Sequence, residues 1–291
     1  MKSFFSTGIR HMLLSTFFFS VMNFFIKKAA NIPAMEVVFF RSFIALVIGL
    51  VMLRQAEESW VGSHRGLLLA RGIFGTLALF SFFITLREMP LGSAVTIQYL
   101  SPIFTTIIAI FILQEKVKPM QWLFFAISFA GILLIKGFDS RISLLYLGMG
   151  IFSAVASGFA YNMVRSLKGK EHPVLVVVHF QLIGTVLGGV YCLFHWQTPQ
   201  GWEWIYLLIV GVMTHLGQIN LTKALQLEKI ATVSIYNYLG IFYALFFGYF
   251  FFDETYGVAA LLGMALVLTG VVINFYYHQR LGRTTAASVQ P

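Results

Sequence analysis

Long apolar segments separated by short polar connections occupy nearly the whole chain. They lie at about 11–28, 34–53, 67–87, 91–113, 119–136, 144–166, 174–195, 203–226, 230–252 and 257–278. Each is near the length of roughly 20 apolar residues that a helix needs to cross the hydrocarbon core of a bilayer. Because lipid offers no hydrogen-bonding partner to a bare backbone, these segments predict an all-α integral membrane protein with ten transmembrane helices.

The composition agrees with this prediction. Hydrophobic residues make up 58% of the 291 residues and charged residues 11%, whereas soluble domains have about 25% charged residues. The net charge of +9 would suggest a nucleic-acid partner for a soluble protein. Here the basic residues fall mostly in short connections, so we expect membrane lipid and no nucleic acid. A single cysteine, Cys192, excludes a disulfide within the chain.

The distribution of lysine and arginine predicts the orientation. Thirteen of the 20 basic residues fall on the side of the two termini and five on the other side, while Arg41 and Arg71 lie within spans. Cytoplasmic connections of membrane proteins carry the excess of lysine and arginine. We therefore expect a multi-pass protein of the inner (plasma) membrane with both termini in the cytoplasm.

The second half of the chain repeats the first. VTIQYLSPIFTTIIAIFILQEKVKP at 95–119 matches SIYNYLGIFYALFFGYFFFDETYGV at 234–258, at an offset of 139. Ser20 meets Ser157 at an offset of 137, so spans 1–5 repeat as spans 6–10. Since five is odd, the second copy enters the membrane from the opposite side.

This arrangement is a 5+5 inverted repeat, which is typical of secondary transporters. We predict two five-helix repeats, at 8–137 and 144–279, followed by a polar C-terminal tail at 281–291. Pro102 is the one proline well inside a span. The carbonyl that it frees must face protein or a cavity.

Several motifs carry a resemblance to a known family. They are FFRSF (Phe39–Phe43), ARGIFGTLAL (Ala70–Leu79), MPLGSAVTIQYLSPIFTTIIAIFILQEK (Met89–Lys116), GILLI (Gly131–Ile135) and GVVIN (Gly270–Asn274). Over about residues 10–278 the chain resembles the EamA family of the drug/metabolite transporter superfamily, most of all the branch with organic-anion and S-adenosylmethionine carriers. The resemblance implies a ten-helix fold and a central cavity lined mainly by spans 1, 3, 4, 6, 8 and 9.

Two arginines inside spans are candidates for binding the substrate. Charges within the bilayer are costly and usually face protein or water. Arg41 and Arg71 either reach an interface or a helix-end carbonyl, or attract an anionic group of the substrate. The planar guanidinium suits a carboxylate.

The other candidates are polar. His215, Gln218 and Thr222 share one face of span 8, where they either line the cavity or bond between helices; if His215 binds substrate, His215→Ala impairs uptake without reducing the folded protein. The repeat supplies a further set of substrate-binding candidates, Gln98, Tyr99, Asn237 and Tyr238. Asn23, Tyr161 and Asn162 are additional candidates.

Two acidic residues occupy equivalent positions beyond spans 4 and 9. Glu115 and Glu254 are predicted to form gate ion pairs or to anchor loops. The sequence contains no metal-binding or nucleophile motif, so we expect no cofactor, no metal site and no catalytic residue.

We therefore predict a secondary transporter that moves a small anionic or zwitterionic organic metabolite by alternating access. An intramembrane enzyme and a channel are the alternatives, and an amino acid or an S-adenosylmethionine-type metabolite is the alternative substrate. The sequence leaves open the substrate, the direction of transport, the coupling to an ion or to exchange, and whether the protein forms a homodimer.

Overall fold

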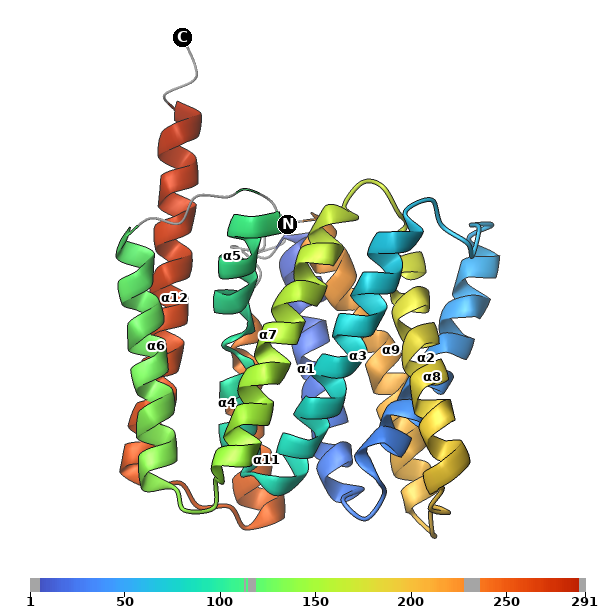
Figure 1. Ribbon diagram of the computed structural model, residues 1–291, viewed down its shortest axis with the longest axis horizontal. Coiled ribbons are helices and arrows are strands. Elements are labelled where there is room, and N and C mark those ends of the chain that lie inside the picture. Colours follow the sequence, from blue (N-terminus) through green and yellow to red (C-terminus); the bar gives the residue numbers. More distant parts are fainter. Residues whose placement is uncertain (1–5, 113, 115–118, 228–235, 288–291) are drawn as a thin grey trace, which may run out of the picture.

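The computed structural model describes residues 6–112, 114, 119–227 and 236–287, and these residues form helices joined by short connections (Figure 1). The helices are α1 (Thr7–Lys28), α2 (Ala34–Gln55), α3 (Arg65–Glu88), α4 (Leu91–Gln98), α5 (Ser101–Ile112), α6 (Pro119–Phe138), α7 (Leu144–Ser166), α8 (Pro173–His195), α9 (Glu203–Leu227), α11 (Leu239–Phe252) and α12 (Val258–Ala287). No strand occurs in these described ranges.

The helices confirm the predicted ten-helix membrane protein. Within the described part of the chain, eight segments are long and apolar enough to cross a bilayer, with α4 and α5 together counting as one. The shorter apolar helices Leu239–Phe252 and Val258–Ile273 supply the other two. Helix α12 continues to Ala287, into the predicted polar tail at 281–291.

The fourth span is interrupted in its middle, where the sequence places Pro102. Helix α4 ends at Gln98 and α5 begins at Ser101. Pro102 has no N–H to donate to the carbonyl of Gln98, so the continuous helical ladder ends there. In the second half Tyr238 interrupts the helical residues at the equivalent place. Broken helices of this kind surround the binding sites of many transporters.

Glycines show that the two halves are related by an approximate two-fold axis. Three pairs of glycines, each 139 residues apart, lie against partners that are also 139 residues apart. The contacts are Gly49 with Val178 and Gly188 with Phe39, Gly72 with Ile183 and Gly211 with Ile44, and Gly131 with Val267 and Gly270 with Ser128. Since each half contains five spans, the halves are inverted with respect to each other.

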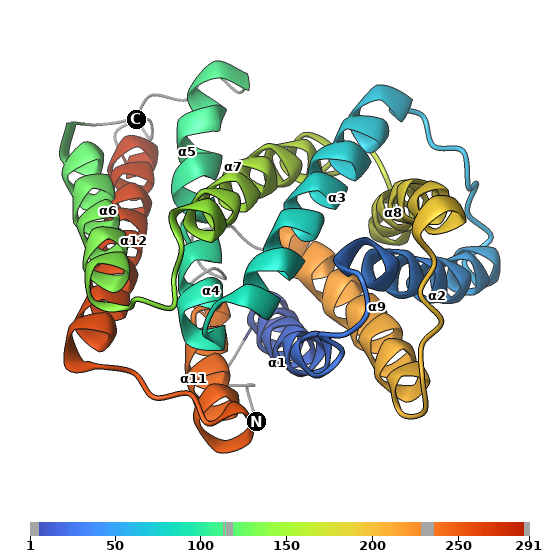
Figure 2. The ribbon, with the colours of Figure 1, turned by 60° about the horizontal axis from the view of Figure 1, so that its bottom comes forward.

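The packing of the helices follows the same symmetry. Helix α1 lies along α9 as α7 lies along α3, while α2 pairs with α8 and α6 with α12. The α6–α12 pair stands at one end of the molecule and the α2–α8 pair at the other (Figures 1 and 2). Helices α1, α3, α4, α5, α7, α9 and α11 lie between these pairs and enclose the centre.

Two sides of the molecule are named by the ends of its helices. Helix α1 begins and α12 ends on the same side, at the top of Figure 1, which we call the terminal side. Helix α1 ends and α12 begins on the other side, which we call the far side. The connections from α3 to α4 and from α11 to α12 both lie on the far side.

Candidate functional site

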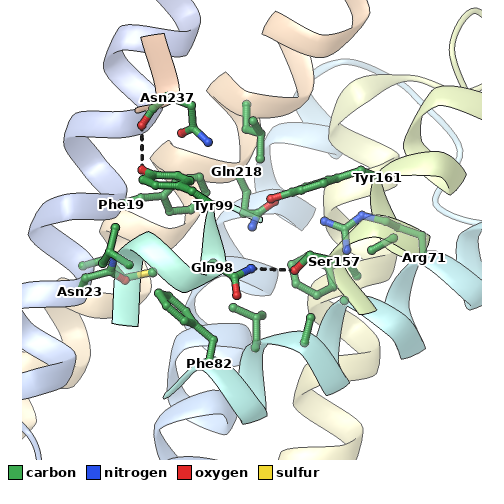
Figure 3. A pocket seen from close by; sticks show the side chains of 18 residues that line it. Phe19, Asn23, Arg71, Phe82, Gln98, Tyr99, Ser157, Tyr161, Gln218 and Asn237 are labelled. Atoms are coloured by element: carbon green, nitrogen blue, oxygen red, sulfur yellow. Dashed lines mark hydrogen bonds between the residues drawn. The ribbon is translucent and has the colours of Figure 1, made fainter. Parts of the chain in front are cut away.

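A cavity of about 110 Å³ lies between the two halves, and residues from both halves line it (Figure 3). Its wall comes from α1, α3, α4, α7, α8 and α9, together with the helix break before α11. Of the predicted substrate-binding residues, it brings together Arg71, Gln98, Tyr99, Gln218 and Asn237. It leaves Arg41, His215 and Tyr238 outside the wall.

The side chain of Gln98 lies at the break of the fourth span and joins it to α7. Its Nε2 donates to Ser157 Oγ at 2.8 Å, and its Oε1 accepts from Ser153 Oγ at 2.7 Å. The break therefore occurs where a polar side chain is held in a fixed orientation at the cavity wall (Figure 3).

The two repeat-related tyrosines meet at the centre of the molecule. The rings of Tyr99 and Tyr238 make an edge contact, with centroids 5.3 Å apart. The hydroxyl of Tyr99 donates to the carbonyl of Asn237 at 2.7 Å, and Gly240 leaves room for this hydroxyl. Tyr238 is buried, and its hydroxyl has no partner among the described residues. The breaks of the two halves are thus bonded to each other beside the cavity.

Among the described residues, Arg71 is the charged residue on the cavity wall. Its guanidinium carbon lies 4.0 Å from the centroid of the Phe180 ring, an arrangement in which the negative face of the ring stabilises the cation. Gly75 makes this possible, because a side chain there would collide with both the guanidinium and Phe180. No carboxylate of the described residues pairs with Arg71.

Arg41 lies behind the wall and is fully buried. Its Nε donates to Thr214 Oγ1 at 3.1 Å. Its guanidinium carbon is 5.5 Å from the ring centroid of Phe180 and 5.8 Å from that of Phe83. Both Nη atoms lack partners within the described part of the chain.

His215 packs between α9 and α2. Its Nδ1 is 3.1 Å from the carbonyl of Ala45, and its Nε2 is 3.0 Å from Met52 Sδ. Because a carbonyl only accepts, Nδ1 carries a proton. Gln218, three residues later, faces the cavity instead.

A second cluster, which we call the far-side cluster, joins the ends of four helices. It consists of Lys27, Glu254 and Tyr256, together with the backbone at Leu91 and Gly92. Glu254 pairs with Lys27 Nζ at 2.7 Å and accepts from the N–H of Leu91 at 2.8 Å. Lys27 also donates to the carbonyl of Met89 at 2.8 Å.

Tyr256 completes the far-side cluster. Its hydroxyl donates to Glu254 and accepts from the N–H of Gly92 at 3.0 Å. Burial, and next the hydrogen bond to Glu254, raise the pKa of Tyr256. The other predicted gate residue, Glu115, lies outside the described residues.

The sequence did not single out several residues of the wall. Phe19, Met22 and Phe180 are examples, and apolar side chains within apolar spans give no distinguishing signal. Ser157 did have one, since it matches Ser20 in the repeat and lies at the cavity wall.

The chain matches the model of the EamA-like transporter family over residues 6–137 and 144–276. It is 29% identical over 269 residues to the pseudopaline exporter CntI of Pseudomonas aeruginosa, covering 91% of this chain and 95% of the relative. With human solute carrier family 35 member G1 it shares 31% over 271 residues, covering 85% and 73%. With the S-adenosylmethionine uptake transporter of Rickettsia felis it shares 22% over 279 residues, covering 94% of each.

The fold also matches a solved structure. A crystal structure superposes with a TM-score of 0.68 at 16% sequence identity, over 94% of this chain and 98% of the other. The relatives above are transporters, which confirms the expectation of a transporter rather than an enzyme. The two matched ranges of the family model, and the ten helices that they cover, show that the chain belongs to the EamA-like transporter family.

Proposed function

We propose that this protein is a secondary transporter that carries a small anionic or zwitterionic organic metabolite across the inner membrane by alternating access. The observation that carries this proposal is Arg71, a buried cation without a carboxylate partner among the described residues, on the wall of a cavity between two inverted halves. A charge in this position is stabilised when a ligand supplies the opposite charge. Gln98, Tyr99, Gln218 and Asn237 would orient the ligand.

The inverted halves support alternating access. In the proposal, the repeats at 8–137 and 144–279 rock about the cavity, so that one arrangement opens it to each side of the membrane in turn. The far-side cluster supports this, because Glu254 bonds both to Lys27 at the end of α1 and to the N–H of Leu91 at the start of α4. Glu254, with its repeat counterpart Glu115, would act as a gate residue.

The predicted cytoplasmic location of the terminal side belongs to this proposal too. Under it, the far-side cluster faces away from the cytoplasm. Cysteines placed singly in the connections at 56–64 and 196–202, in a protein in which Cys192 is replaced by Ser, would report the two sides by their access to an impermeant thiol reagent. Labelling of 196–202 from outside intact cells is the expected result.

The substrate class is tested with purified protein. Ligands that bind the native state raise the melting temperature by mass action. The panel contains organic anions, amino acids, nucleosides and S-adenosylmethionine, and we expect stabilisation by acids or amino acids. S-adenosylmethionine is included because one relative is an uptake transporter for it.

Arg71→Gln is the decisive variant. A hydrogen bond to a charged group contributes about 1.5–3 kcal/mol, so we expect affinity to fall roughly 10- to 150-fold. Arg65→Gln is the matched control, because Arg65 begins the same helix and is exposed. Binding of anions by Arg71→Gln at wild-type affinity, in protein that remains folded, would refute the proposed role of the cavity.

A further inference from the structure

Phe180 contacts two arginines, only one of which reaches the cavity. Arg71 lies on the cavity wall with its guanidinium carbon 4.0 Å from the centroid of this ring. Arg41 lies 5.5 Å from the same centroid but does not line the cavity. The ring of Phe180, which is itself part of the wall, therefore contacts both cations.

Arg41 is connected to the wall at a second point. The hydroxyl of Thr214 accepts from Arg41 Nε and donates to the sulfur of Met22, each at 3.1 Å. Met22 also lines the cavity. Arg41 thus lies behind the wall, in contact with Phe180 directly and with Met22 through Thr214.

Several N–H donors of Arg41 and Arg71 have no hydrogen-bond partner among the described residues. Both Nη atoms of Arg41 and the Nε of Arg71 are buried without a partner among the described residues. No carboxylate in the described ranges pairs with either arginine. A buried charge usually has a partner, and leaving one unpaired is costly. Two such cations on one ring would each be stabilised by a negative charge from outside the chain.

We infer that the substrate carries two acidic groups, and that Arg41 forms a second anion subsite which opens when the side chain of Phe180 rotates. The inference rests on the proposed function and deepens it. Arg71 holds the first carboxylate at the wall, and the planar fork of Arg41 takes the second. Since both guanidinium carbons lie within 5.5 Å of one ring centroid, a short carbon spacer between the acids suffices.

The position of Phe180 in the wall gives this residue its role. Phe180 and Arg71 line the cavity, whereas Arg41, which contacts the same ring, does not. Rotation of Phe180 enlarges this space toward Arg41. A ligand with one acidic group binds at Arg71 without that movement, whereas a diacid must displace the ring to reach Arg41. The ring of Phe180 therefore lowers the affinity for diacids and leaves that for monoacids unchanged.

Matched probes test the inference. Succinate and its monoamide succinamate, and glutamate and glutamine, are pairs of nearly equal size that differ by one acidic group. The concentration that gives half-maximal thermal stabilisation of the purified protein is measured for each. In the wild type we expect the diacid to act at a concentration at least tenfold lower than its monoamide, which corresponds to about 1.4 kcal/mol.

Variants then locate the effect. In Arg41→Gln the difference within a pair disappears, while both members still bind through Arg71. Arg54→Gln is the matched control, since Arg54 is exposed in the last turn of the same helix, and it keeps the difference. Phe180→Leu retains both arginines and removes the ring, so we expect the preference for the diacid to increase. This variant tests the subsite even if Arg41→Gln fails to fold.

The outcomes separate the two claims. Binding of monoamides through Arg71 with no gain from a second acid overturns the second subsite and leaves the proposed function intact. A diacid preference that persists in Arg41→Gln, or does not change in Phe180→Leu, also overturns it. If no acid stabilises the wild type, the proposed function fails and this inference falls with it.

Discussion

The two halves of the protein share their backbone arrangement but not their buried arginines. Arg41 and Arg71 belong to the first half, and at an offset of 139 their counterparts in the second half are Phe180 and Val210. The repeat therefore supplies the arrangement of helices, which we call the frame, while the first half supplies the two buried arginines. The counterpart of one arginine is the ring that both arginines contact.

Two polar residues of α9 likewise occur in one half without a similar counterpart in the other. His215 and Gln218 of the second half correspond to Thr76 and Leu79 of the first. An inverted pair of halves needs matching backbones in order to exchange conformations, but a ligand without two-fold symmetry is held best by a site that lacks it. The comparison teaches that repeat-related residues such as Gln98 and Asn237 bring both halves to the cavity, whereas the arginine on its wall comes from one half.

The frame gives the largest expected effect. Gly131 and Gly270 are related by the repeat, and each lies against the backbone of the other helix of the α6–α12 pair. A Cβ at Gly131 would come within 2.6 Å of the carbonyl of Gly263, and one at Gly270 within 2.6 Å of that of Phe124. Gly131→Val and Gly270→Val should each destabilise the protein by about 1–3 kcal/mol or more, because the helices must separate.

Thermal melting of the purified variants measures this effect. Gly148→Val is the control, because Gly148 lies in a spanning helix with open space around it. A large effect of one member of the pair and none of the other would show that the symmetry of the frame does not hold at this contact.

The sequence predicted the frame well because its signals are long and repeated. Ten apolar segments, the 139-residue offset and Pro102 identify the spans, the repeat and the broken helix without any knowledge of packing. The arginines were harder, since Arg41 and Arg71 look alike in the sequence. Which of them reaches the cavity depends on how α2 and α3 are rotated against α8.

Helical spacing explains why His215 and Gln218, both predicted to line the cavity, have different neighbours. Positions three apart are separated by about 60° around a helix, so they share a broad face without sharing a neighbour. His215 accordingly contacts α2, while Gln218 reaches the cavity. Phe180 had no signal of its own, because an aromatic residue in an apolar span is ordinary.

The variant His215→Ala is expected to have an effect of intermediate size on stability. His215→Ala removes the contacts with the carbonyl of Ala45 and with Met52 Sδ and leaves a void, so we expect a loss of about 1–3 kcal/mol in stability. Ligand affinity should change by no more than about twofold, since His215 does not line the cavity. Thermal melting and ligand titration measure the two effects.

The repeat supplies the control for this variant. The hydroxyl of Thr76, the counterpart of His215, has no partner in the described part of the chain, so Thr76→Val should alter stability little. Loss of binding or uptake by His215→Ala without a fall in melting temperature would instead support the role for His215 that the sequence suggested.

The smallest effect concerns the two central tyrosines. The hydroxyl of Tyr99 donates to the carbonyl of Asn237, whereas the hydroxyl of Tyr238 is buried without a partner among the described residues. Tyr99→Phe should therefore cost about 0.5–1.5 kcal/mol, and Tyr238→Phe should be neutral or slightly stabilising, because an unsatisfied buried hydroxyl is removed. Both variants keep the edge contact between the rings, so their melting temperatures compare the hydrogen bond alone. Equal losses from the two substitutions would contradict this prediction. They would indicate that Tyr238 also donates a hydrogen bond in another state of the transport cycle. The unequal hydrogen bonding of the two tyrosines would then belong to one conformation and not to the sequence.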